Sequence, residues 1–139
     1  MESKLSPREI IEKMMSQDNM SRWLGIEILS YIPGAVSLRM HVRDEMCNGF
    51  GVTHGGITYS LADSALAFSA NSYGIQSMSI ETSISHMKSV HTGDILTVHT
   101  KQLVLTRKTG VFEMEVFNQH NIMVAHFKGT VYRSDKIWE

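Results

Sequence analysis

The chain has 139 residues, enough for one domain with a buried core but not for two. Its 42% apolar and 19% charged residues are typical of a globular chain rather than a disordered one. With 13 Lys and Arg against 14 Asp and Glu, the net charge of −1 gives no reason to expect a nucleic acid or an anionic membrane as partner.

The single cysteine excludes an intramolecular disulfide and permits a reducing compartment. The first residues carry charge where a signal peptide needs an apolar stretch. No window approaches the roughly 20 apolar residues that span a bilayer. We therefore expect a soluble, cytoplasmic protein.

The first predicted helix begins at Ser6. The Ser6 hydroxyl can accept a bond from a first-turn amide, Pro7 needs no N–H at that position, and Glu9 completes a capping box. One apolar stripe then predicts a helix to about Asn19, formed by Ile10, Ile11, Met14 and Met15.

Two strands are expected next. The first covers residues 23–32 and ends in Pro33-Gly34, a pair suited to a type II turn. In the second, apolar and polar residues alternate, which predicts one buried face made of Val36, Leu38, Met40 and Val42.

After a loop at 44–53, the sequence predicts a long helix over about 54–73 that is buried nearly all round, with Gly74 as its stop. Many of its residues are small, so a sheet can wrap closely around it. Four further strands are predicted at about 76–87, 93–106, 111–119 and 122–134.

This order of elements predicts an α+β fold in which an antiparallel sheet covers one long helix. No repeat or linker interrupts the chain. We expect a single domain over residues 1–139, with an N-terminal helix at 1–20 and the core at 21–134.

Asp63 is the only formal charge between Gly55 and Ile80. A carboxylate in such an apolar helix is costly unless it is paired or protonated. Asp63 is therefore a candidate catalytic group. The alternatives are a solvated stripe of the helix or a bond to neighbouring backbone.

His54-Gly55-Gly56 opens the same helix, whose free N–H groups suit a carbonyl oxygen or an oxyanion. Alternatively, the glycines only make a turn and His54 caps it. Asn48-Gly49, in the loop before this helix, is typical of a tight turn and needs no further role to explain it. Cys47 is expected to be a small buried residue, and the histidines show no metal-ligand spacing, so we expect no metal site.

These residues belong to a longer pattern, made of Asn48-Gly49-Phe50-Gly51-Val52-Thr53-His54-Gly55-Gly56, Ser60-Leu61-Ala62-Asp63, Ala70-Asn71-Ser72, Gly93-Asp94, Lys108-Thr109-Gly110-Val111-Phe112 and Val124-Ala125-His126-Phe127-Lys128-Gly129. Over residues 20–134 the chain resembles the PaaI-type hotdog-fold thioesterases, the acyl-CoA thioesterases of phenylacetate degradation. The spacing of Asn, His-Gly-Gly and Asp makes the likeness specific.

The resemblance implies a long helix wrapped by an antiparallel sheet, and hydrolysis of an acyl-CoA thioester without a separate cofactor. Asp63 would activate water or attack the thioester carbon itself. The Gly55 amide would polarise the carbonyl, Asn48 would orient the reacting groups, and His54 would support the loop. Ser79 would help to place the water, or is a polar residue on the exposed face of a strand.

Gly55 and Asp63 are eight residues apart, about 12 Å along a helix axis. A carboxylate must come within about 3 Å of the atom on which it acts. One chain can hardly bring both groups to one thioester carbon. We therefore expect a two-fold dimer with shared sites, and the resemblance also suggests a dimer of dimers.

The phosphates of CoA need cations, for which Lys88, Arg107, Lys108 and Arg133 are candidates; each has the alternative of a plain solvated charge. Residues 81–89 lack the aromatic and Arg-Pro residues of many relatives. The acyl group is therefore less defined than the reaction, and the expected substrate is an aryl- or arylacetyl-CoA such as a hydroxylated phenylacetyl-CoA.

Two other functions remain on the same fold. A hydratase of enoyl-thioesters needs a paired acid and base, and no such spacing is present. A non-catalytic acyl-CoA sensor gains nothing from an unpaired carboxylate at Asp63, and residues 1–20 are too short and not basic enough to bind DNA.

Overall fold

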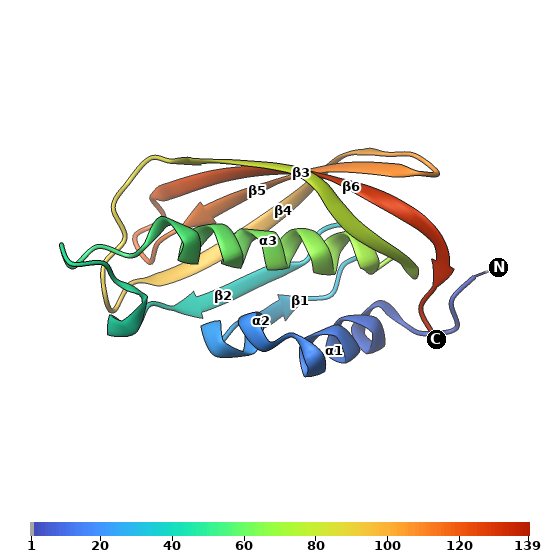
Figure 1. The fold of residues 1–139 in the computed structure, drawn as a ribbon, viewed down its shortest axis with the longest axis horizontal. Coiled ribbons are helices and arrows are strands. Elements are labelled where there is room, and N and C mark those ends of the chain that lie inside the picture. Colours follow the sequence, from blue (N-terminus) through green and yellow to red (C-terminus); the bar gives the residue numbers. More distant parts are fainter. Residues whose placement is uncertain (1) are drawn as a thin grey trace.

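The computed structural model describes residues 2–139, in which a curved sheet wraps around one long helix, α3 (Figure 1). The elements are α1 (Pro7–Gln17), α2 (Asn19–Leu24), β1 (Glu27–Ser30), β2 (Ser37–His41), a 3₁₀ turn (Asp44–Met46), α3 (Gly55–Asn71), β3 (Ile75–His86), β4 (Ile95–Leu105), β5 (Thr109–Phe117) and β6 (Met123–Ile137).

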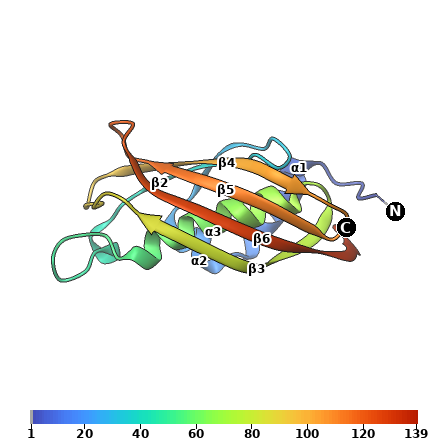
Figure 2. The same ribbon diagram turned by 90° about the horizontal axis from the view of Figure 1, so that it is seen from above.

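The six strands form one sheet in the order β1-β2-β4-β5-β6-β3, and all neighbours are antiparallel. Seen from above, β4, β5, β6 and β3 lie side by side across α3 (Figure 2). The strand that directly follows α3 is thus at a sheet edge. The predicted α+β hotdog architecture is confirmed.

The core lies between α3 and the concave face of the sheet. Leu61, Leu66 and Phe68 from α3 are at most 1% exposed. The expected alternation in the strands is confirmed, because the inward residues are buried: Leu38, Met40, Phe112, Met114, Val116 and Phe127. Helices α1 and α2 lie beside α3 (Figure 1), and each adds a buried side chain to the core, Ile11 from α1 and Leu24 from α2.

The start of the chain differs from its prediction. Ser6 and Glu9 form the expected capping box, but α1 ends at Gln17. The Asp18 side chain accepts a bond from the Ser21 amide and begins a second helix, which Gly25 ends at φ +72°. The strand expected over 23–32 is therefore wrong in its first half, and β1 keeps four residues.

The ends of α3 agree closely with the prediction. The chain leaves the helix through Ser72, and Gly74 has the positive φ of +94° that favours glycine after a helix. Asn71 fastens this end to β3, because its amide donates to the Ser77 carbonyl at 3.0 Å and its oxygen accepts from the Ser77 amide at 2.8 Å. The helix is thus held beside the edge strand.

No helix in residues 2–139 is long and apolar enough to cross a membrane.

Candidate active site

Asp63 lies on a stripe of α3 that the rest of the chain leaves partly open. The same stripe carries small residues, Ser60 and Ala67 one turn away on either side and Gly56 two turns before Asp63. These side chains do not shield the carboxylate by their bulk, so a ligand or a second subunit can approach it. Most other side chains of α3 are buried.

Partial burial raises the pKa of the Asp63 carboxyl, and the nearby Asp18 carboxylate raises it further. Within residues 2–139 neither a hydrogen bond nor a cation lowers that pKa. The alternative of a hydrogen bond between Asp63 and neighbouring backbone is not found in the described part of the chain.

The N-terminus of α3 presents unused donors. His54 is its N-cap residue, as the alternative expects, but the His54 side chain makes no capping bond. No acceptor for the Gly55 amide is found in the part of the chain that the structure describes. This amide is available to a ligand at the positive end of the helix dipole.

Asn48 organises the loop before α3. Its side-chain oxygen accepts bonds from the Phe50 amide at 2.9 Å and the Val52 amide at 3.3 Å, which is the turn function considered above. No partner for its side-chain NH₂ group is found among the described residues, so this group can face a ligand. Cys47 is only half-buried, contrary to expectation, and its sulfur lies 3.1 Å from the Thr92 hydroxyl near the surface.

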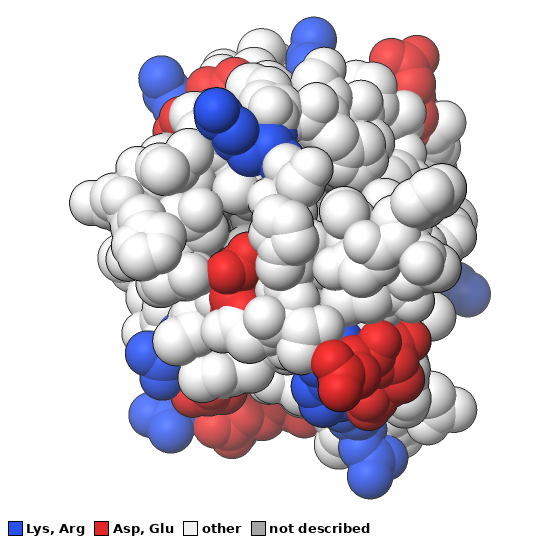
Figure 3. Space-filling model, turned by 90° about the vertical axis from the view of Figure 1, so that its left-hand side faces the viewer, with Lys and Arg blue, Asp and Glu red and all other residues white. Residues whose placement is uncertain are grey.

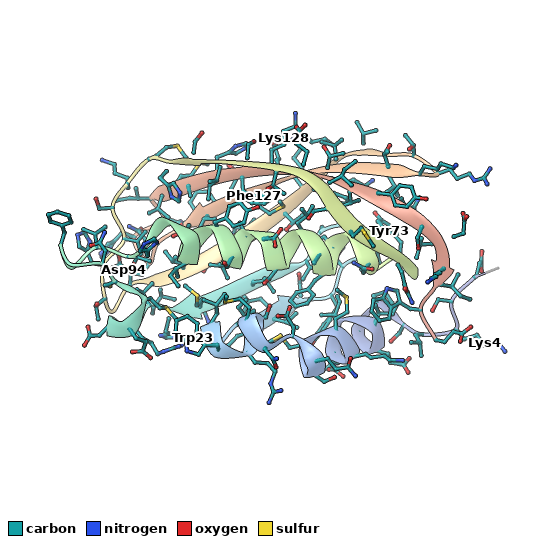
Figure 4. The ribbon with its side chains drawn as sticks, viewed as in Figure 1. Lys4, Trp23, Tyr73, Asp94, Phe127 and Lys128 are labelled. Atoms are coloured by element: carbon teal, nitrogen blue, oxygen red, sulfur yellow. The ribbon has the colours of Figure 1, made fainter. Side chains whose placement is uncertain are left out.

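Helix α3 and strand β3 run antiparallel beside each other, and three contacts define their alignment. Asn71 meets Ser77, Tyr59 meets Thr82, and Gly55 meets His86. With rises of about 1.5 Å and 3.3 Å per residue, Asp63 lies level with residues 79–81. In Figure 4, α3 begins at the side labelled Asp94 and ends at the side labelled Tyr73.

Ser79 is level with Asp63 and lies on the helix side of the sheet. It is directly opposite Val131 on β6, and residues opposite each other share a face. Val131 is 1% exposed and points into the core, whereas Ser79 is exposed at the sheet edge. Ser79 is thus exposed, as the alternative expects, but on the same side of the sheet edge as α3.

A cavity of about 270 Å³ adjoins the N-terminus of α3, lined by Gly55 and Thr58 from the helix and by His86 and Lys88 from the end of β3. Figure 3 shows this end of the molecule, where the middle of the face is mostly uncharged and the charged side chains gather toward its top and bottom. His86 was not among the residues selected from the sequence, which does not show that β3 returns beside the helix start.

The four basic residues proposed for CoA do not come together in one chain. Lys88 lines the cavity at Gly55, whereas Arg107 and Lys108 line another beside Ile75, at the far end of β3. Arg133 also lies there, since its guanidinium is 5.9 Å from the Tyr73 ring and donates to the Thr106 carbonyl at 2.6 Å.

No group of three or more His, Cys, Asp or Glu side chains in residues 2–139 has the arrangement of a metal site.

Comparison with known proteins agrees with this arrangement. A family model described as the thioesterase superfamily matches residues 50–125. A putative esterase of Archaeoglobus fulgidus is 40% identical over 120 residues, covering 86% of this chain and 78% of the relative. The acyl-coenzyme A thioesterase PaaI of Escherichia coli is 34% identical over 120 residues and 86% of each chain.

The solved structure of Escherichia coli PaaI, from the phenylacetic acid degradation operon, superimposes with a TM-score of 0.92 over 94% of this chain and 95% of that one, at 31% identity. A Streptococcus mutans protein solved with bound acetyl CoA superimposes with a TM-score of 0.79 at 27% identity, over 81% and 91% of the two chains. The chain belongs to the thioesterase superfamily, as a PaaI-type hotdog protein.

Proposed function

We propose that this protein hydrolyses an acyl-CoA thioester to a free acid and CoA. The observation that carries the proposal is Asp63, a half-buried carboxylate with a raised pKa and no hydrogen-bond or ion-pair partner among residues 2–139. The names of the relatives supply the substrate class, since Escherichia coli PaaI is an acyl-coenzyme A thioesterase. A pure binding protein gains nothing from leaving such a group unpaired.

The reaction needs a base or nucleophile and a donor for the carbonyl oxygen. Asp63 takes a proton from water as the water attacks the thioester carbon, or attacks that carbon itself and forms an anhydride that water opens. The Gly55 amide donates to the oxygen that gains negative charge. The carbon–sulfur bond then breaks, and the CoA thiolate takes up a proton.

The neighbouring residues support these two. The free NH₂ group of Asn48 orients the substrate or the water at the loop before α3. His54 holds the turn in which Gly55 lies, because its backbone N–H donates to the Met46 carbonyl at 2.9 Å. Ser79, level with Asp63, hydrogen-bonds the attacking water.

The site is completed by a second copy of the chain. Asp63 and Gly55 are about 12 Å apart along α3. Strand β3 is a long edge strand whose exposed residues include Met78 at 65% and Ile80 at 63%. Such an edge pairs readily with another strand. Two β3 strands paired antiparallel across a two-fold axis join the sheets of two subunits.

The alignment of α3 with β3 also sets the register of this pairing. Gly55 is level with His86, and Asp63 is level with residues 79–81. Gly55 therefore faces the partner's Asp63 only if the two-fold axis passes near Ser83. Each dimer then has two equal sites, and pairing of dimers gives a tetramer.

This register also brings the four basic residues proposed for CoA together, from two subunits. Arg133 is opposite Ser77 on β3, and an axis near Ser83 brings Ser77 of the partner subunit opposite Ser89. The partner's Arg133, with its Arg107 and Lys108, then lies beside Lys88. These four cations then surround the mouth of the site, where they can bind the phosphates of CoA.

For the acyl group we propose an aryl or arylacetyl chain such as hydroxyphenylacetyl. The similarity to the protein of the phenylacetic acid degradation operon supports this choice. The approach to Asp63 past Gly56, Ser60 and Ala67 also leaves room for a ring.

The first test is thiol release from a panel of acyl-CoA thioesters with phenylacetyl, hydroxyphenylacetyl, benzoyl, short and long acyl groups. The Asp63→Asn variant should lose about 10²–10⁴-fold in rate. Glu12→Gln, which makes the same change of charge on the exposed surface of α1, should retain the wild-type rate. Wild-type protein that binds these thioesters without cleaving them would contradict the proposal and indicate an acyl-CoA sensor.

The shared site is tested by complementation. Gly55→Pro removes the N–H at the first helical position, where proline fits, and Gly55→Ala is its matched control because it keeps the N–H. Inactive Gly55→Pro and Asp63→Asn chains, refolded as a mixture, should regain about a quarter of the wild-type activity, since half of the dimers then contain one intact site. No recovery would mean that each site lies within one chain.

A further inference from the structure

His86 faces the same cavity as the Gly55 amide. It is the last residue of β3 and stands opposite the buried Ala125 on β6, so its ring points to the helix side of the sheet. A Cβ atom added at Gly55 would lie 3.3 Å from Nε2 of His86 and 3.6 Å from its Cε1. The tip of the imidazole is thus directed at the first residue of α3.

The two nitrogens are close enough to serve one acceptor. A backbone nitrogen lies about 2.5 Å from the Cβ position of its own residue, so Nε2 of His86 and the amide nitrogen of Gly55 are no more than about 6 Å apart. Two donors that each bond one oxygen at about 2.9 Å are separated by at most the same distance. A carbonyl oxygen in the cavity therefore fits between them.

The His86 ring is also free to donate. His126 bonds Glu113 at 3.2 Å and His120 approaches Gln119 at 3.4 Å, whereas no partner for His86 is found in residues 2–139. A neutral imidazole carries one N–H, and an imidazolium carries two.

We propose that His86 is a catalytic residue that donates a second hydrogen bond to the thioester carbonyl oxygen, together with the Gly55 amide. This inference rests on the proposed hydrolysis. As the water or Asp63 adds to the carbon, the oxygen gains negative charge and both donors bind it more strongly. The proton stays on His86 throughout, and the charge returns to the thiolate when the carbon–sulfur bond breaks.

The role predicts a particular pattern of kinetic constants. His86→Phe keeps a ring of similar size but removes the donor, and should lower kcat by about 10²–10³-fold, the usual loss for one such donor. The KM should change less than about threefold, since the bond strengthens only in the transition state. His86→Gln supplies an amide donor and should recover at least tenfold of the loss. His99→Phe is the matched control, because His99 already packs against the Phe117 ring, 5.9 Å away on a different part of the sheet.

A measurement without turnover separates this inference from the proposed function. Phenylacetyl-CoA bound to Asp63→Asn should show its carbonyl stretch at lower frequency than in water, and the double variant Asp63→Asn/His86→Phe should lose part of that shift. A kcat of His86→Phe equal to the wild type, or an unchanged carbonyl frequency in the double variant, would overturn the role of His86 and leave the thioesterase proposal intact. Absence of turnover by the wild type would instead overturn the thioesterase proposal, while the carbonyl shift would still report on the two donors.

Discussion

Asp18, between α1 and α2, lies close enough to Asp63 on α3 for its charge to raise the pKa of the Asp63 carboxyl. The two segments are also connected through hydroxyl groups. Ser21 donates to Asp18 at 2.6 Å and lies 2.7 Å from the Ser64 hydroxyl, next to Asp63 in sequence. The N-terminal helices therefore belong to the electrostatic surroundings of the proposed base.

Asp18→Asn should lower the pKa of Asp63, because it removes the like charge while the amide oxygen still caps α2. The proposed base acts as a carboxylate, so the acid limb of the profile of kcat/KM against pH should move to lower pH. Asp44→Asn, on the 3₁₀ turn, is the control and should leave the limb in place. An unmoved limb in Asp18→Asn would contradict the coupling.

Asp63 should cost stability at neutral pH. Its pKa in the folded protein is raised above 3.8, so the folded state binds the proton more tightly than the unfolded state. Stability then falls as the pH rises from about 3.8 through the folded pKa. Thermal unfolding of Asp63→Asn should occur at a higher temperature than that of the wild type at pH 7. Below pH 3.8 the two proteins should unfold at the same temperature. A variant that is less stable than the wild type at pH 7 would contradict the expected stabilisation.

The register of the proposed dimer is open to cross-linking. A cysteine on a two-fold axis between antiparallel strands faces its own copy with about 4.5–5.5 Å between Cα atoms, within the range of a disulfide. In a Cys47→Ser background, Ser83→Cys should give a covalent dimer on mild oxidation. Ser77→Cys is the control, since an axis near Ser83 separates its two copies by 12 strand positions. Cross-linking of both, or of Ser77→Cys alone, would refute the register.

Gly129 on β6 is where α3 approaches the sheet most closely. A Cβ there would overlap the side chain of Leu66, which is 1% exposed and has little room to move. Gly129→Ala should therefore destabilise the fold by about 1–3 kcal/mol. Gly49→Ala, where a Cβ meets nothing within 4 Å, should change stability by less than about 0.5 kcal/mol in the same denaturant titration. Equal stability of the two variants would argue against this packing.

Local patterns were sufficient for much of the architecture. The capping box at Ser6, the alternation in β2 and β5 and the small-residue helix with Gly74 as its stop were all found as predicted. Each depends on neighbours within a few positions, so the chain itself contains the information. The start of α2 was missed because the apolar residues before Gly25 fit a strand equally well, and the Asp18 cap decides between the two.

The sequence by itself determined which residues are chemically unusual. Asp63 stands out as the one charge in an apolar helix, and the spacing of Asn48, Gly55 and Asp63 identifies the family. What only the tertiary structure decided is which residues meet: Asp18 beside Asp63, His86 beside Gly55, and Lys88 apart from the other three cations. The two contacts join residues 31 and 45 positions apart, and their geometry depends on how the sheet curves around α3, which no local periodicity encodes.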